Sequence, residues 1–265
     1  MHHDIHHFAM GRWLLLLAYV VSVAGSFTGL ACTRRAVAAG DGPHRTRWLL
    51  IAAISIGGVG IWLMHFIAML GFTVPGVALR YDLWWTAGSA ALSISAVFIG
   101  LLVLGPTVRA GRLLIGGLIT GLAVNLMHYT GMRAIRFQGR IHYDTRLVAL
   151  SVLIAVVAAT AALLFTLILE STPLRLIGGA VMGVAVVGMH YTGMAAVRVE
   201  VDPALPAPVG MAVFSFLFPV FVLGLLGLAV PITALLTTTP AAPSARPRST
   251  APSRRTSRAR LPKSA

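Results

Sequence analysis

The sequence has few charged residues, and acidic ones are the scarcest. Of its 265 residues, 11% are charged and seven are aspartate or glutamate. Soluble globular proteins carry about 25% charged residues, so this composition excludes an ordinary soluble domain. The long apolar stretches hold almost no carboxylate, since Glu170 lies at the end of one of them. Proton-coupled transport and acid–base catalysis therefore lack the groups on which they usually depend.

Cysteine and the common catalytic motifs are equally scarce. The single cysteine, Cys32, excludes an intramolecular disulfide, and we expect a buried thiol near the end of the first apolar stretch. The sequence contains no P-loop, no G-x-S-x-G and no protein-kinase signature. We therefore expect a protein that is not an enzyme and has no catalytic residues.

Hydrophobic residues, in contrast, make up 57% of the chain and gather in long runs. A membrane-spanning helix needs about 20 predominantly apolar residues. Seven stretches meet this requirement, so the sequence predicts an all-α membrane protein with seven transmembrane helices. They lie at roughly 13–32, 48–72, 84–105, 112–135, 146–169, 175–197 and 210–236.

The basic residues give these spans an orientation. With the N-terminus outside, 14 of the 21 lysines and arginines fall on the inner side of the membrane and seven on the outer side. The positive-inside rule favours this arrangement, although the balance depends on the C-terminal tail and the outer loop from Arg133 to Arg146 is unusually basic. We predict a multi-pass protein of the bacterial plasma (inner) membrane, with its N-terminus outside and its C-terminus cytoplasmic.

Composition divides the chain into three parts. Residues 1–12 form a histidine-rich extracytoplasmic leader without the features of a cleaved signal peptide, and 13–236 form the membrane domain. The tail 237–265 is rich in Pro, Ser, Ala and Arg, and we expect it to be disordered. Attraction to anionic lipids of the bilayer explains its arginines, so we expect no nucleic-acid partner.

The membrane region contains an internal repeat. Histidines at 65, 128 and 190 are 63 and 62 residues apart, and each is preceded seven positions earlier by a glycine: Gly58, Gly121 and Gly183. Helices 1–2, 3–4 and 5–6 then form three copies of one two-helix unit, with helix 7 as an addition. Such units enter the membrane in the same direction, so the three histidines should lie at one depth around a pseudo-threefold axis.

Methionines accompany each histidine at fixed positions. On a helix, residues i and i+4 share a face, so each histidine can act together with the methionine four positions later. Imidazole and thioether groups form a soft ligand set that suits copper better than calcium, magnesium or zinc. The plain alternative is that the methionines pack and the histidines bond to neighbouring helices. The predicted ligands are His65, Met69, His128, Met132, His190 and Met194, with Met64, Met127 and Met189 at the side.

Other polar residues surround the motif. The hydroxyl groups of Tyr129, Tyr191, Thr130 and Thr192 are candidates for support of the histidines. Asn125 lies one turn from His128, and an interhelical hydrogen bond is its simplest role. For the repeated glycines, together with Gly131 and Gly193, we expect a role in close helix approach rather than contact with a ligand.

The leader MHHDIHHF offers a second, auxiliary metal site. Its four histidines could gather a metal outside the membrane and pass it to the inner site. The alternatives are a solvated polar leader or an artificial tag. The residues concerned are His2, His3, His6 and His7.

The repeated words MHYT at 127–130 and 189–192, with the degenerate MHFI at 64–67, resemble the MHYT domain of bacterial integral membrane proteins. The resemblance covers about residues 6–236. It implies a seven-helix sensor domain that is thought to bind copper near the outer face and to sense O2, CO or NO. Members are often fused to domains that make or degrade cyclic di-GMP. Only 29 residues follow helix 7 here, so we expect a separate signalling partner.

Three functions remain open at this point. The first is a copper-holding membrane sensor of redox state or of a diatomic ligand. The second is copper transport or delivery to a respiratory oxidase, which the histidine-rich leader favours. The third is haem ligation by histidines of two helices, which fits threefold repetition less well.

Overall fold

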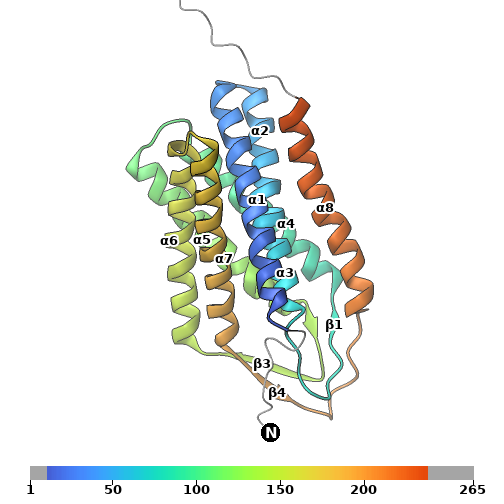
Figure 1. Cartoon of the computed structure of the whole chain (residues 1–265). Helices are drawn as coiled ribbons and strands as arrows, with labels where there is room; N and C mark the ends of the chain where they lie inside the picture. Colours follow the sequence, from blue (N-terminus) through green and yellow to red (C-terminus); the bar gives the residue numbers. More distant parts are fainter. Residues whose placement is uncertain (1–10, 238–265) are drawn as a thin grey trace, which may run out of the picture.

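A computed structural model describes residues 11–237, and all seven predicted spans are helices in it (Figure 1). The histidine-rich leader and the basic tail lie outside the described residues. The first helix, α1, continues to Ala38 rather than ending near residue 32. The helices are α1 Trp13–Ala38, α2 Pro43–Ala53, η1 Ile54–Leu63, α3 Met64–Met69, α4 Leu83–Leu104, α5 Ala110–Arg133, α6 Thr145–Ile168, α7 Thr172–Ala195 and α8 Val213–Thr237.

Six spans form a closed ring, and the seventh packs on its outside. Around the ring, α1 contacts η1, η1 contacts α4, and contacts then continue through α5, α6 and α7 back to α1. The second span, which is α2, η1 and α3 in succession, is the most buried because α8 covers it from outside. The histidine-bearing spans are alternate members of this ring, as the threefold repeat predicts.

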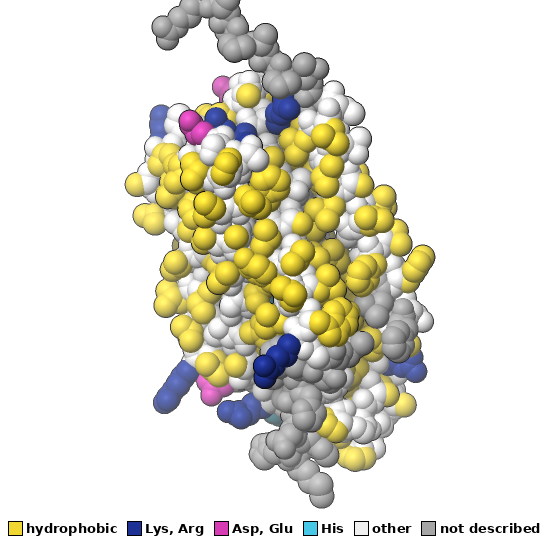
Figure 2. Space-filling view, viewed as in Figure 1, with side chains coloured by type: hydrophobic (Ala, Val, Ile, Leu, Met, Phe, Trp, Pro, Cys, Tyr) yellow, Lys and Arg dark blue, Asp and Glu magenta, His cyan; other side chains and the backbone are white. Residues whose placement is uncertain are grey.

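The outer surface has the character of a membrane protein. Large apolar side chains such as Leu114, Leu153 and Val184 are more than half exposed. Yellow hydrophobic side chains cover the middle of the molecule, and charged side chains gather towards its two ends (Figure 2). Helices suit this environment because they satisfy their backbone hydrogen bonds internally. The chain is a multi-pass membrane protein by these criteria.

Short strands close the end of the bundle where the histidines lie. They are β1 Arg80–Tyr81, β2 Ile135–Arg136, β3 Gly139–Tyr143, β4 Val197–Val201 and β5 Met211–Ala212. One sheet has the order β2–β1–β5, and β3 pairs with β4; all pairs are antiparallel.

Two aspartates tie this end together in a repeated way. Asp82 and Asp144 are the N-caps of α4 and α6, and each carboxylate accepts hydrogen bonds from two backbone N–H groups of its helix. Their own N–H groups donate to the carbonyl oxygens of Ala134 and Ala196, at 2.8 Å in both cases. In the second and third repeats, the end of the histidine-bearing helix is thereby fixed to the start of the other helix of the same two-helix unit.

The segment η1 is a π-helix, which the sequence pattern does not predict. Serine hydroxyls of the flanking helices bond its carbonyl groups: Ser22 Oγ donates to Gly60 O at 2.7 Å, and Ser93 Oγ donates to Gly57 O at 2.8 Å. Glycines at these positions let α1 and α4 approach closely enough for both bonds. π-Helical segments often occur at functional sites, and this one ends one residue before Met64 of the first histidine motif.

Candidate metal centre

The three repeated histidines meet inside the ring. Nδ1 of His65 lies 3.0 Å from Nδ1 of His190 and 3.2 Å from Nδ1 of His128. The ring centroids are 5.0 to 5.1 Å apart, and the ring planes are inclined to one another by 78° to 86°. The three imidazoles are thus nearly perpendicular to one another. All three side chains are at most 1% exposed. The predicted common depth and pseudo-threefold placement are both confirmed.

Hydrogen bonding among the histidines cannot account for this arrangement. A neutral imidazole nitrogen carries either one N–H or one lone pair, so it makes one good hydrogen bond. Nδ1 of His65 has two short nitrogen neighbours and can satisfy only one of them. A buried polar atom without a partner is costly. In the tautomer that leaves Nδ1 unprotonated, the three histidines would direct their lone pairs to one point, which is the donor set that a cation requires.

The spacing also fits a small transition-metal ion. Bonds of about 2.0 Å to a tetrahedral ion hold imidazole nitrogens about 3.3 Å apart. The observed spacings of 3.0 and 3.2 Å are within a few tenths of an ångström of this value. Nitrogen ligands without carboxylates suit copper or zinc rather than magnesium or calcium. Among residues 11–237, this is the one cluster of His, Cys, Asp or Glu side chains with metal-ligand spacing.

Glycines of the motif lie against the neighbouring histidines, which is a more specific role than the close helix approach that we expected. A Cβ atom on Gly131 would lie 2.5 Å from Nε2 of His65, and one on Gly193 would lie 2.5 Å from Nε2 of His128. Each ring thus packs edge-on against the next repeat. No other group within the described part of the chain bonds the Nε2 atoms of His65 and His128.

The aromatic residue after each histidine has a shared role that does not need a hydroxyl group. Phe66, Tyr129 and Tyr191 each pack edge-to-face on the preceding histidine, with centroids 4.9 to 5.0 Å apart and planes inclined by 83° to 88°. The first repeat therefore keeps the supporting contact although it has phenylalanine in place of tyrosine.

Two hydroxyl groups that we expected near the histidines bond elsewhere. Tyr129 Oη lies 3.1 Å from Ser151 Oγ, and Thr192 Oγ1 donates to Gly188 O of its own helix. Asn125 Nδ2 also donates to Ser151 Oγ, at 3.0 Å, which confirms its interhelical role. The sequence contains a signal for this network, because Ser89 of α4 and Ser151 of α6 are 62 residues apart. Ser89 accepts a hydrogen bond from Trp62 of η1.

All six methionines of the motif are buried, at 0 to 2% exposure. Met132 lines a pocket at the histidine end of the bundle, and Met189 lines an internal cavity. Whether their sulfur atoms bind a metal stays a prediction. The predicted ligands of the leader lie outside the described residues. His142 is remote from the triad and lies 3.2 Å from Glu200 on the neighbouring strand.

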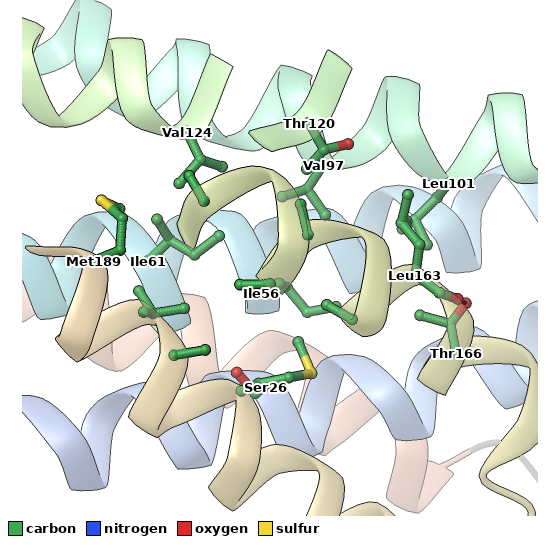
Figure 3. A pocket seen from close by; sticks show the side chains of 17 residues that line it. Ser26, Ile56, Ile61, Val97, Leu101, Thr120, Val124, Leu163, Thr166 and Met189 are labelled. Atoms are coloured by element: carbon green, nitrogen blue, oxygen red, sulfur yellow. Dashed lines mark hydrogen bonds between the residues drawn. The ribbon is translucent and has the colours of Figure 1, made fainter. Parts of the chain in front are cut away.

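The internal cavity adjoins the triad on the side of the membrane interior. It has a volume of about 50 Å³ and an apolar lining from all six ring spans. Met189, which precedes His190, lies at one end of it, and Thr166 lies towards the other (Figure 3). The hydroxyl of Ser26 points to this cavity and has no hydrogen-bond partner within residues 11–237. The space suffices for one small molecule.

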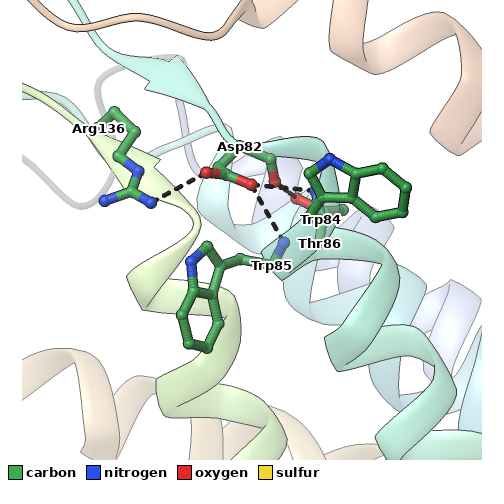
Figure 4. A network of polar contacts seen from close by, with 5 residues as sticks. All are labelled: Asp82, Trp84, Trp85, Thr86 and Arg136. Atoms are coloured by element: carbon green, nitrogen blue, oxygen red, sulfur yellow. Dashed lines mark hydrogen bonds and ion pairs between the residues drawn. The ribbon is translucent and has the colours of Figure 1, made fainter.

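A polar network lies beside the triad at the same end of the bundle. Asp82 caps α4 by accepting hydrogen bonds from the N–H groups of Trp84 and Trp85, and it forms a 2.9 Å ion pair with Arg136 of β2 (Figure 4). The hydrogen bond from Arg136 lowers the pKa of the Asp82 carboxyl, and the two capping bonds act in the same direction.

Comparison with known proteins identifies the repeat. The family described as MHYT, bacterial signalling protein N-terminal repeat, matches residues 58–117, 121–179 and 183–244. Each matched segment begins at the glycine seven residues before a histidine, which confirms the period. Each matched unit begins in the middle of a histidine-bearing helix and continues into the helices that follow it. Our two-helix unit, in contrast, ends with the histidine-bearing helix, so the two divisions of the repeat start at different points. No solved structure matches the chain.

Several curated relatives are similar over most of this chain. The bifunctional diguanylate cyclase/cyclic di-GMP phosphodiesterase MucR of Pseudomonas aeruginosa is 40% identical over 191 residues, which is 70% of this chain and 27% of the relative. The cyclic di-GMP phosphodiesterase NbdA of the same organism is 35% identical over 201 residues, 73% of this chain and 25% of NbdA. The signaling protein YkoW of Bacillus subtilis is 30% identical over 224 residues, 82% of this chain and 27% of YkoW.

The chain thus spans about a quarter of the length of these relatives, and the similarity concerns the membrane repeats. The repeat match, the seven spans and the three repeated histidine motifs agree with one another. The chain belongs to the MHYT family of bacterial signalling-protein repeats.

Proposed function

We propose that this protein is a membrane sensor that holds copper at His65, His128 and His190 and reports a change at that site through its helices. The observation that supports this most is the convergence of three buried Nδ1 atoms, among which that of His65 has two short nitrogen neighbours and can make a good hydrogen bond to one of them. Methionines four residues after each histidine, and those just before, are the proposed additional ligands. Copper bound there would supply a redox-active centre that also takes diatomic ligands.

The protein residues couple the site to the helices. Each histidine belongs to a different repeat, so a change in the spacing of the Nδ1 atoms displaces the ends of three alternate helices relative to one another. The ring of Phe66 links His65 to α8, because it packs 5.4 Å from Phe216, which stacks on Tyr81 at 4.5 Å. We propose that this aromatic contact carries the displacement to α8, the helix that leads to the C-terminus.

The internal cavity supports a small uncharged molecule as the signal. Its apolar lining excludes ions, and its volume of about 50 Å³ excludes most metabolites. Met189 lies between this space and His190 along α7. A diatomic gas dissolved in the bilayer fits these limits. By analogy with MucR and NbdA, the output that we propose is a change in cyclic di-GMP turnover by a partner protein.

Metal analysis of the detergent-purified protein tests the proposal. We expect about one copper per chain, lost in the triple variant His65→Ala, His128→Ala and His190→Ala. His142→Ala is the matched control, because this histidine is exposed and remote from the triad. Circular dichroism checks that the variants keep their helices. Copper-free protein from copper-replete cells, or equal copper in the triple variant, contradicts the proposal.

Copper delivery to an oxidase is the second candidate, and the four histidines of the leader favour it. Deletion of residues 2–7 separates the two. A delivery role predicts lower oxidase loading in the deletion strain, whereas a sensor keeps its copper-dependent change in cyclic di-GMP. Haem ligation is disfavoured, since nitrogens 3.0 and 3.2 Å apart leave no space for a macrocycle between two axial ligands.

A further inference from the structure

A second pocket opens at the histidine end of the bundle, between α5, α6, the start of α4 and strands β2 and β3. Its volume of about 660 Å³ is in the range of small-molecule sites. Of its lining residues, the proposed function uses Met132 alone. Its lining combines two arginines, Arg133 and Arg136, with aromatic and aliphatic side chains, among them Trp85, Tyr129, Leu126 and Val148.

The positive charge of this pocket is only partly compensated. Arg136 is paired with Asp82 at 2.9 Å through one nitrogen of its guanidinium group (Figure 4). Arg133 lies over the Trp85 ring, 5.0 Å from its centroid, and no carboxylate of the described residues lies within ion-pair distance of it. Arginines favour phosphate because their planar N–H groups match its oxygens.

Strand pairing adds a third cation. Arg80 of β1 lies directly opposite Arg136 of β2. Like charges opposite one another destabilise an antiparallel pair unless an anion lies nearby. Of these three arginines, Arg136 is the one that forms an ion pair with Asp82, and Arg80 lies outside the pocket lining. Of the unusually basic loop between Arg133 and Arg146, the first two arginines line this pocket.

The other half of the pocket is apolar and borders the lipid. Leu126 is 57% exposed on the membrane-facing side of α5, and Val148 lies one turn into α6. Trp85 lies near the start of its span, where tryptophans mark the membrane–water interface. The site therefore offers cations at the interface and aliphatic contact towards the bilayer, which is the pattern of an anionic lipid rather than of a polar metabolite.

We propose that this pocket binds a phosphate group between Arg133 and Arg136, carried by an anionic phospholipid whose acyl chain lies along Leu126 and Val148. Tyr129 borders both this pocket and His128, on which its ring packs at 4.9 Å. The bound lipid is then one side chain away from the triad. The proposal needs no metal and stands independently of the copper proposal.

Native mass spectrometry of the purified full chain with phosphatidylglycerol and with phosphatidylcholine tests this site. We expect selective retention of phosphatidylglycerol, reduced about tenfold in Arg133→Gln and in the double variant Arg133→Gln/Arg136→Gln. Arg133→Gln alone keeps the ion pair between Asp82 and Arg136, so a loss of lipid in this variant does not result from breaking that pair. The double variant Arg140→Gln/Arg146→Gln is the matched control, with the same loss of charge at the same end but outside the pocket lining.

A parallel titration with inorganic phosphate distinguishes the source of the anion. Lipid binding without phosphate binding identifies the headgroup, whereas phosphate binding that is lost in Arg133→Gln identifies a soluble phosphate at the same site. Equal retention of the two lipids without phosphate binding overturns the proposal. An equal loss of lipid in the Arg140→Gln/Arg146→Gln control also overturns it, because it indicates diffuse surface charge.

Discussion

Gly131 lies against the imidazole of His65, so closely that a Cβ atom at this position would be 2.5 Å from Nε2. The glycine belongs to the second repeat and the histidine to the first. Gly193 of the third repeat has the same relation to His128 of the second. Gly131 and Gly193 therefore set the orientation of the imidazole rings of His65 and His128, which pack against them.

We predict that Gly131→Ala displaces His65 and lowers copper occupancy at least tenfold. The added methyl group cannot be accommodated without moving a ring whose Nδ1 is held between two others. Copper content and the absorption spectrum of the purified variant measure the effect. Gly188→Ala is the matched control, because no atom lies within 4 Å of a Cβ there although His190 is two residues away. Unchanged copper in Gly131→Ala refutes the prediction.

We predict that Ser151→Ala destabilises the bundle by about 1 kcal/mol, since Asn125 and Tyr129 then lose their shared partner. Unfolding in mixed detergent micelles measures the change. Asn125→Leu combined with Ser151→Ala should recover part of the loss, because an unpaired buried amide no longer remains. A double variant less stable than the sum of the single ones contradicts this account.

We predict that Phe216→Leu uncouples α8 from the copper site that we propose, without removing the metal. Leucine keeps the site apolar, although it loses some packing volume, and it removes the ring contacts with Phe66 and Tyr81. Hydrogen exchange of α8 with and without bound copper is the measurement. The copper-dependent difference should fall in Phe216→Leu and persist in Phe218→Leu, whose side chain is 76% exposed on the same helix.

Asp82 should make the stability of the folded protein depend on pH. Its folded-state pKa is lowered, so the carboxylate contributes stability above its ordinary pKa near 3.8, and this contribution is lost as the pH falls through the lower folded value. Asp82→Asn and Arg136→Gln should each lower stability at pH 7, by less than about 1 kcal/mol because the pair is partly exposed. Thermal unfolding should reveal a smaller difference between wild type and Asp82→Asn below pH 3. A difference that is constant with pH argues against the ion pair.

Membrane orientation stays a prediction, which labelling of intact cells tests. The native Cys32 is buried and gives no background. With the N-terminus outside, an impermeant maleimide should modify His142→Cys, which is exposed on β3, and spare Asp41→Cys at the other end of the bundle. The reverse pattern establishes the opposite topology.

The sequence predicted the helices and the histidine triad because both depend on periodicity. Apolar length defines a span, and the spacings of 63 and 62 residues place His65, His128 and His190 at one depth. Periodicity says nothing about which ring nitrogen points inward, and here it is Nδ1. It also cannot reveal that Gly131 faces a histidine, because that contact joins two repeats.

The π-helix and the roles of the hydroxyl groups depended on tertiary structure. The segment η1 depends on hydrogen bonds from Ser22 and Ser93, which lie on other helices. The hydroxyl of Tyr129 looked available to His128 because they are adjacent, yet Ser151 of α6 bonds it instead. Only the repeated serines, Ser89 and Ser151, could have indicated this network in advance.

The triad also sets an order for the biogenesis of the protein. His65 enters the membrane in the second span, and its partner His190 follows 125 residues later in the sixth. The centre can therefore close only after α7 has been inserted and has packed against α1. A metal that needs all three histidines would then be bound late in maturation, by protein whose three repeats have all been inserted.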